Sequence, residues 1–199
     1  MVALGHYYNE QGQSEFRVFT PECRDMALRL EATQQTLPME RQASGYWTLT
    51  QPRLALGTRY RFVVDGTAYP DPASRWQPDG VHGASAICEP SKVQSPGWRG
   101  VTIEDAIIYE LHVGTFTPEG TLAAAQAKLP HLQALGITVV ELLPLAAFPG
   151  ERNWGYDGTY LFALHGAYGS YADLQAFIEA AHDLGIAVIL DVVYNHFGP

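Results

Sequence analysis

The sequence predicts an all-β, immunoglobulin-like sandwich followed by an α/β domain that holds the first three strands of a truncated (β/α)8 TIM barrel. The first half contains short segments that alternate apolar and polar residues, with turn signals about every ten positions. The second half alternates nearly continuous apolar strands with helical patterns, which is typical of a parallel sheet covered on both faces. We therefore expect a sandwich at residues 1–93, a linker at 94–104 and an incomplete barrel domain at 105–199.

The strands of the first half are predicted from their alternating pattern and from the turns between them. Asp65-Gly66 separates two apolar runs and is a strong signal for a two-residue hairpin turn. Residues 70–80 contain three prolines, which exclude regular structure, so we expect a loop that lies over a surface. The expected strands include residues 16–19, 27–30, 45–49 and 60–63.

The second half is predicted to alternate strand and helix. A run with apolar residues at helical spacing ends at Gly136, and Pro130 predicts a kink or a break inside it. Ser170, followed by Asp173, predicts the capped start of a second helix, which Gly185 ends. The expected strands are residues 106–112, 137–143 and 186–193.

Composition and charge exclude some classes of partner. The net charge is −9 and the 12 basic residues are scattered, which argues against a nucleic-acid partner. The sequence has no stretch of about 18 apolar residues, so we expect no membrane-spanning helix. The N-terminal residues lack the basic start and apolar core of a signal peptide, and we expect a cytoplasmic protein. Cys23 and Cys88 are far apart in the sequence, and free thiols are favoured over a disulfide.

Polar residues follow the last apolar strand. Val188–Leu190 runs into Asp191, and Asn195 and His196 come shortly after it. In a parallel barrel the carboxyl ends of the strands form one rim, and active sites lie there. The loop expected at residues 144–169 also leads from this rim, and loops of that length are usually functional. The sequence therefore predicts an active-site rim.

Three sequence blocks resemble the start of the barrel in the α-amylase superfamily, glycoside hydrolase family 13. They are YELHVGTF at residues 109–116, NWGYDG at 153–158 and DVVYNH at 191–196. The first half resembles the β-sandwich that several members carry before the barrel. Within the superfamily, the closest resemblance is to the maltooligosyltrehalose trehalohydrolases. It rests on residues 70–83, 148–158 and 194–199.

The resemblance implies retaining hydrolysis of the α-1,4 bond that joins a terminal trehalose unit to a maltooligosaccharide. Such hydrolysis needs two carboxyl groups about 5–5.5 Å apart. In the family the nucleophile Asp, the general-acid Glu and a further Asp lie on later strands, so we expect no catalytic residue within residues 1–199. This chain alone is therefore expected to be inactive, and no cofactor is implied. The expected partners are maltooligosyl trehalose or a related α-1,4-glucan, and the remainder of the barrel in the same or a companion polypeptide.

The rim residues that are present are expected to bind the sugar. His196 is the first candidate for a hydrogen bond to the glucose at the cleavage site, because a neutral imidazole both donates and accepts. Tyr156 is the candidate aromatic platform beneath that glucose. Trp154 either packs beneath Tyr156 or faces the substrate, with packing favoured. Asp157 and Asn195 are further candidate substrate-binding residues.

Three of the rim residues are expected to support the site. Asn195 is expected to shape its loop, and in calcium-binding members of the superfamily a matching Asn is a ligand. Because nothing else here supplies the several oxygen ligands that calcium needs, no metal is expected. Asp191 is expected to anchor the rim rather than to touch substrate. His112 ends the first barrel strand, and it either lines the base of the cleft or makes a structural hydrogen bond.

Two alternative functions stay open. A glycogen branching or debranching enzyme of the same superfamily shares the layout, although Asp157-Gly158 and Tyr194-Asn195 favour the trehalohydrolases. A non-catalytic glucan-binding module with a vestigial barrel start would place all glucan affinity in residues 1–93.

Overall fold

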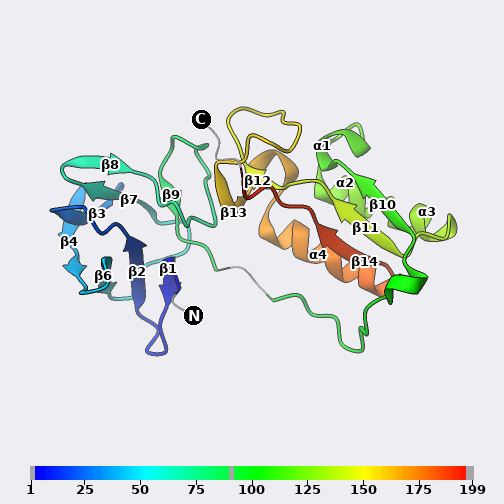
Figure 1. Ribbon diagram of the computed structural model, residues 1–199, viewed down its shortest axis with the longest axis horizontal. Coiled ribbons are helices and arrows are strands. Elements are labelled where there is room, and N and C mark those ends of the chain that lie inside the picture. Colours follow the sequence, from blue (N-terminus) through cyan, green and yellow to red (C-terminus); the bar gives the residue numbers. More distant parts are fainter. Residues whose placement is uncertain (1–2, 90–91, 196–199) are drawn as a thin grey trace. The chain divides into compact units, whose positions relative to one another are not determined.

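The computed structural model describes residues 3–89 and 92–195 and divides the chain into two compact units (Figure 1). One unit comprises Met1–Glu89 together with Tyr160–Ala163, and the other comprises Pro90–Thr159 and Leu164–Pro199. Each unit has its own cluster of buried apolar side chains, as separate domains do. Within the described ranges we find no helix with the length and apolar character that crossing a membrane requires.

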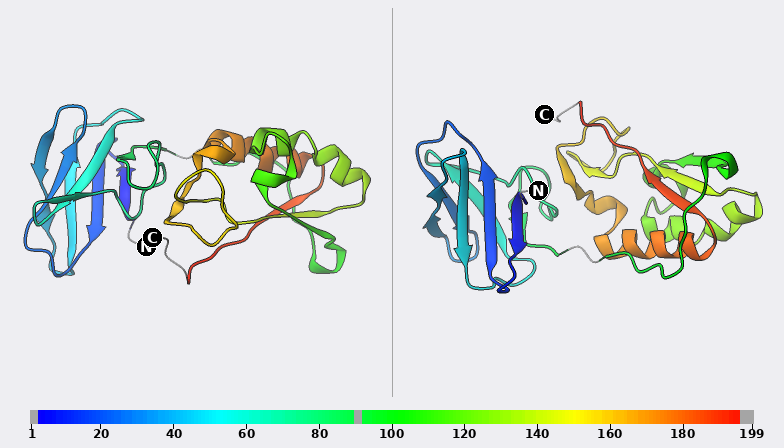
Figure 2. Two further views of the ribbon diagram at one scale, coloured as in Figure 1. Left: turned by 90° about the horizontal axis from the view of Figure 1, so that it is seen from above. Right: turned by 60° about the horizontal axis from the view of Figure 1, so that its bottom comes forward.

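Two antiparallel sheets form the first unit (Figure 2). The first sheet has the order β1-β2-β6-β5, and its strands are β1 (Gly5–Tyr8), β2 (Ser14–Phe19), β5 (Glu40–Arg41) and β6 (Tyr46–Gln51). The second has the order β4-β3-β7-β8, with β9 also paired to β7. Its strands are β3 (Met26–Leu30), β4 (Gln35–Pro38), β7 (Arg59–Val64), β8 (Thr67–Tyr69) and β9 (Ser85–Ala86).

The local sequence signals of this unit are confirmed. Three of the predicted strand segments lie within β2, β3 and β7, and the segment 45–49 lies in β6 except for Gly45, which precedes it. Asp65 and Gly66 join β7 to β8 with φ angles of 47° and 87°, as a two-residue hairpin turn requires. Residues 70–84 contain neither helix nor strand, in line with the prolines there.

The core of the first unit contains large side chains from both sheets. Phe16 of the first sheet and Leu28 and Phe62 of the second are almost completely buried. Full burial of each such side chain contributes about 1.5–3 kcal/mol. The alternation of polar and apolar residues therefore has a direct cause, because every second residue of these strands faces this core.

A three-stranded parallel sheet is the centre of the second unit, in the order β10-β11-β14. Its strands are β10 (Ile108–Leu111), β11 (Val139–Leu142) and β14 (Ala187–Leu190), each shorter than predicted. The longest helix is α4 (Tyr171–Asp183), which packs on β14 and against α2 (Leu122–Gln126) (Figure 1). The shorter elements of this unit are η1 (Ile103–Asp105), α1 (Val113–Phe116), α3 (Leu129–Ala134), β12 (Ala146–Ala147) and η2 (Gly166–Tyr168). A further strand, β13 (Tyr160–Leu164), belongs to the first unit except for its last residue.

The two faces of this sheet are covered to different extents by described residues. Val140 and Leu142 pack with helix side chains in the buried cluster. Ile108 and Ile189, on the other face, are 48% and 40% exposed, and Glu110, which lies in β10 on the same face as Ile108, is exposed as well. Val139, which alternation also places on this second face, is 4% exposed, so the face is partly covered. The prediction of a sheet covered on both faces is therefore not confirmed at Ile108, Glu110 and Ile189.

The helix signals were correct in kind, with one error of position. Ser170 caps α4 in a capping box with Asp173, as predicted. Gly136 and Gly185 have φ angles of 85° and 76°, which suit residues that follow helix ends. The predicted helix does break, but the break separates α2 from α3 before Pro130. Pro130 lies in the first turn of α3, where the N–H that proline lacks would have no partner in the helix.

Candidate active-site rim

The carboxyl ends of the parallel strands place two predicted residues at one edge of the sheet. His112 directly follows β10, and Asp191 directly follows β14. The backbone N–H of Asp191 donates to the Leu142 carbonyl at 2.9 Å and so extends the pairing of β14 with β11. This edge is the position of the rim that the sequence predicts.

A turn built on Asn153 lies in the loop after β11. Asn153 is 7% exposed, and its side-chain Oδ1 accepts hydrogen bonds from the backbone N–H groups of Gly155 at 2.7 Å and Asp157 at 3.4 Å. Gly155 has a φ of 105°, and a Cβ atom there would lie 3.1 Å from Cδ of Pro144. The turn thus depends on a buried amide and on a position that only glycine fits without strain.

This turn exposes two aromatic side chains. Trp154 is 87% exposed and Tyr156 is 62% exposed, while Asn153 and Gly155 between and beside them are buried. The favoured interpretation of Trp154, packing beneath Tyr156, is therefore wrong, because so exposed a side chain packs on little of the described protein. Two neighbouring exposed aromatics offer apolar ring faces on which a sugar ring can stack. Asp157, in the same turn, is exposed too.

His112 connects this turn to the end of β10. Its Nε2 lies 2.8 Å from the backbone oxygen of Asn153, and because that oxygen only accepts, Nε2 carries the proton. The hydroxyl of Tyr168 lies 3.4 Å from the same nitrogen, and the two rings meet edge to face. Of the two roles predicted for His112, the structure shows the structural hydrogen bond.

A second histidine lies in the same cluster without joining the turn. The ring of His165 stacks on Phe148 with the centroids 3.6 Å apart, and its Nδ1 accepts from the Phe148 backbone N–H at 3.4 Å. Burial lowers the pKa of His165, which keeps this nitrogen available as an acceptor. His165 therefore contacts this loop at Phe148, whereas His112 contacts it at Asn153.

The other predicted residues are not brought into this cluster. Asn195 is exposed, and neither it nor the side chain of Asp191 makes a hydrogen bond with another described residue. His196 lies outside the described residues. In residues 3–89 and 92–195 no three His, Cys, Asp or Glu side chains are grouped as a metal ion would require.

The sequence interpretation gave no role to Asn153 and did not single out Tyr168. Both contact His112, Asn153 from a turn 41 residues away and Tyr168 from η2, 56 residues away. For Asn153 a local signal existed. An Asn two residues before a Gly is a common start of a turn in which the Asn side chain accepts from the following backbone. For Tyr168 no local signal existed.

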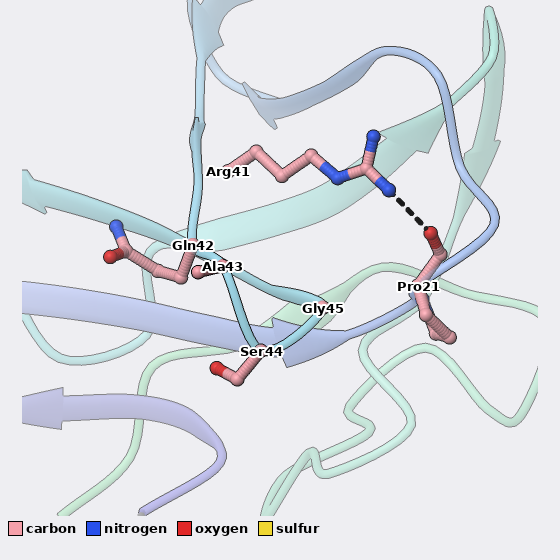
Figure 3. Close-up of a pocket in the computed structure, with 6 residues that line it drawn as sticks. All are labelled: Pro21, Arg41, Gln42, Ala43, Ser44 and Gly45. Atoms are coloured by element: carbon pink, nitrogen blue, oxygen red, sulfur yellow. Dashed lines mark hydrogen bonds between the residues drawn. The ribbon is translucent and has the colours of Figure 1, made fainter.

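A separate surface hollow of about 520 Å³ lies in the first unit (Figure 3). It is lined by Pro21, Arg41, Gln42, Ala43, Ser44 and Gly45. The Arg41 guanidinium donates to the Pro21 carbonyl at 2.7 Å, and the Gln42 amide donates to Thr48 at 3.0 Å. The hollow contains none of the predicted site residues and two of its polar side chains are already paired, so the rim is the better candidate.

Two family models match the chain. Residues 68–199, well over half of the chain, match the family described as alpha amylase, catalytic domain. Residues 3–79 match the family described as carbohydrate-binding module 48, the isoamylase N-terminal domain.

Individual relatives are similar over almost the whole chain. The malto-oligosyltrehalose trehalohydrolase of Deinococcus radiodurans is 46% identical over 188 residues, which are 94% of this chain and 31% of that protein. The enzyme of the same name from Saccharolobus solfataricus is 43% identical over 200 residues, covering 100% of this chain and 35% of its own length. A crystal structure of an alpha amylase from Salmonella typhimurium has a TM-score of 0.92 at 46% identity, covering 99% of this chain and 34% of that one. The chain spans about a third of the length of these proteins.

Proposed function

The chain belongs to the α-amylase family, and we propose that it is the front portion of a retaining α-glucan hydrolase that releases trehalose from maltooligosyl trehalose. The bond cleaved is the α-1,4 bond next to the terminal trehalose unit. The observation that carries the proposal is the similarity to two malto-oligosyltrehalose trehalohydrolases over nearly all of the chain. The exposed aromatic pair at the rim supports it, because such a pair suits a sugar ligand.

The rim residues bind the sugar in this proposal and leave its bonds intact. Tyr156 is the platform for the glucose at the cleavage site, and Trp154 offers a second stacking face beside it. Asp157 and Asn195 supply polar contacts, and His196 donates to and accepts from sugar hydroxyls.

The proposal places the nucleophile and the general acid beyond residue 199. A retaining enzyme needs one ionised and one protonated carboxyl group about 5–5.5 Å apart. Asp157 belongs to an exposed turn and Asp191 directly follows β14, and the proposal assigns neither of them to the catalytic pair. Asp191 remains a supporting residue of the rim.

The parallel sheet is the start of an eight-stranded barrel in this proposal. The exposed face with Ile108, Glu110 and Ile189 supports it, because later strands would close around that face and cover it. The remainder of the barrel is thus the required partner of residues 105–199. The proposed sandwich is immunoglobulin-like and occupies residues 1–93, and residues 94–104 form the linker. We place the protein in the cytoplasm, where Cys23 and Cys88, free in the structure, stay reduced.

The test is an assay of trehalose release by the full-length protein that carries this sequence. Maltotriosyl trehalose is the substrate, and maltopentaose, which has no trehalose end, is the control. We expect trehalose and maltotriose from the substrate, with the new reducing end formed first as the α anomer. Transfer of chains between amylose molecules without release of trehalose would instead identify a branching enzyme and overturn the proposal.

A second measurement separates the enzyme from a glucan-binding module. The full-length protein is titrated with maltoheptaose in a calorimeter, with Tyr156→Ala as the comparison. We expect the variant to bind more weakly. Equal binding by both proteins, together with no hydrolysis, would move the glucan site away from the rim and favour the module.

A further inference from the structure

Two polar residues, the buried Asn153 and the partly buried His112, hold the exposed aromatic turn in place. The side-chain oxygen of Asn153 accepts from the backbone N–H groups of Gly155 and Asp157. The backbone oxygen of Asn153 accepts from Nε2 of His112 at 2.8 Å. The first two bonds close the turn that carries Trp154 and Tyr156, and the third joins this turn to the carboxyl end of β10. We call the pair the His112–Asn153 latch.

The polar side-chain atoms of His112 and Asn153 that make no hydrogen bond are buried, so a sugar in solvent does not contact them. Nδ1 of His112 and Nδ2 of Asn153 are both buried, and within the described ranges neither has a hydrogen-bond partner. A buried polar atom without a hydrogen-bond partner lowers the stability of the folded state. We therefore expect the other polar atoms of these two side chains to make hydrogen bonds that offset this loss. Those other atoms all bond to the turn or to the residue that anchors it.

Two glycines leave space for neighbouring rings, Gly155 for Pro144 beside the turn and Gly114 for the imidazole of His112. A Cβ atom on Gly155 would lie 3.1 Å from Cδ of Pro144, and one on Gly114 would lie 3.0 Å from Cε1 of His112 and 3.1 Å from Cε1 of Tyr168. The imidazole is therefore confined between Gly114, Tyr168 and the Asn153 carbonyl. A ring held from three sides keeps its orientation, and the turn bonded to it keeps its position.

We propose that His112 and Asn153 are positioning residues of the glucan site, which act by fixing the turn that presents Trp154 and Tyr156. The inference rests on the proposed function for the identity of the ligand, a maltooligosaccharide chain, and on the hydrogen bonds for the role of the two residues. It predicts that the side-chain oxygen of Asn153 and the Nε2–H of His112 are the groups that matter. The unpartnered Nδ2 and Nδ1 are dispensable for this role.

Matched variants of the full-length protein separate these groups. Asn153→Ala removes the accepting oxygen, whereas Asn153→Asp keeps it and replaces Nδ2 by a second oxygen. His112→Leu removes the donor, whereas His112→Gln offers an amide N–H near the position of Nε2. His165→Gln is the control, because His165 lies in the same cluster but bonds to Phe148 and not to Asn153.

The first readout is hydrogen exchange at the backbone amides of Gly155 and Asp157, which needs no substrate. Because their acceptor is lost, we expect exchange about tenfold faster in Asn153→Ala. The same two amides should exchange faster in His112→Leu, since the turn loses its anchor. Asn153→Asp, His112→Gln and the His165→Gln control should stay within about twofold of the wild type. If Asn153→Ala fails to fold, His112→Leu carries the test, because it leaves the bonds inside the turn intact.

The second readout is the kinetics of trehalose release from maltotriosyl trehalose. A displaced platform weakens binding of substrate and transition state alike, so we expect KM to rise about tenfold in Asn153→Ala and His112→Leu, with kcat within about threefold. The conservative variants should restore KM. An equal rise of KM in Asn153→Ala and Asn153→Asp would contradict the proposed positioning role. Unchanged hydrogen exchange in Asn153→Ala would contradict it as well.

The two readouts distinguish the latch from the proposed function. The protein could release no trehalose while hydrogen exchange is still faster in Asn153→Ala and His112→Leu. This result would support the positioning role of the latch and contradict the proposed substrate. Normal trehalose release by the wild type, with unchanged hydrogen exchange and unchanged KM in Asn153→Ala, would support the proposed function and contradict the positioning role of the latch.

Discussion

The two units use buried polar residues in opposite ways. In the first unit, Asp71 is completely buried and accepts from the Tyr60 hydroxyl at 2.6 Å and from the Ala73 backbone N–H at 2.8 Å. In the second unit, the buried amide of Asn153 holds a turn whose neighbouring side chains, Trp154 and Tyr156, are exposed. The first network ties a loop into a core, whereas the second supports an exposed aromatic surface. Burial alone therefore does not identify a functional site, and what the buried group holds in place is more informative.

The largest effect is expected from removing the carboxyl group of Asp71. Asp71→Ala leaves the Tyr60 hydroxyl and the Ala73 N–H buried without an acceptor, at about 1–3 kcal/mol for each group. We expect the full-length protein to lose about 3 kcal/mol of unfolding free energy, measured by urea denaturation. Asp71→Asn, which keeps a side-chain oxygen, is the control and should lose less. If Asp71→Ala lowers the unfolding free energy by less than about 1 kcal/mol, the Asp71 network does not stabilise the core, and the contrast between the two units is contradicted.

The opposite result is expected at the aromatic turn. Tyr156→Ala removes an exposed side chain, so the unfolding free energy should change by no more than about 0.5 kcal/mol. The value of kcat/KM for trehalose release should fall about tenfold, as expected for loss of one aromatic stacking contact. Tyr194→Ala is a useful control, because Tyr194 is also 62% exposed but lies outside the turn. A large loss of stability in Tyr156→Ala would show that the tyrosine packs instead of binding.

Two buried groups of the first unit give opposing pH dependences. Burial raises the pKa of Asp71 to about 6, so the folded state holds this proton more tightly and stability is lost as the pH rises from about 4 to about 6. Burial, with the charges of Arg75 and Arg53, lowers the pKa of His6 to about 4. The stability that a neutral His6 contributes is therefore lost as the pH falls from about 6.5 to about 4.

These slopes oppose each other, and single variants should reveal each one. We expect the wild-type melting temperature to vary little between about pH 4 and pH 6. His6→Gln should become less stable as the pH rises through this window, and Asp71→Asn should become less stable as it falls. Melting curves at half-unit pH intervals measure both. The same slope in the two variants would contradict the assignment of the two groups.

A smaller effect is expected at the start of α4. Ser170→Ala removes the hydroxyl that accepts from the Asp173 backbone N–H, and the loss of such a cap costs about 1 kcal/mol. Ser170→Thr keeps the hydroxyl and is the matched control. Because the helix lies in the second unit, the change should appear in the unfolding of that unit and leave the pH slopes of the first unchanged. A wild-type melting curve for Ser170→Ala would show that the box is not needed.

The sequence predicted features that depend on neighbouring residues. The Asp65-Gly66 turn and the Ser170 capping box form because the groups involved lie within a few positions of each other. The pairing of Tyr60 with Asp71 and of His112 with Asn153 depends on how distant segments pack, which no local pattern encodes. The exposure of Trp154 was misjudged although a local signal was present, because Asn153 two residues before Gly155 marks the turn that exposes it.

The most direct test of the central claim is the location of glucan contacts in the full-length protein. Hydrogen exchange is measured across the chain with and without saturating maltoheptaose. The account predicts slower exchange at residues 153–158, with no change around Asp71 or in β2 and β7 of the first unit. Protection confined to the first unit, with residues 153–158 unaffected, would contradict it.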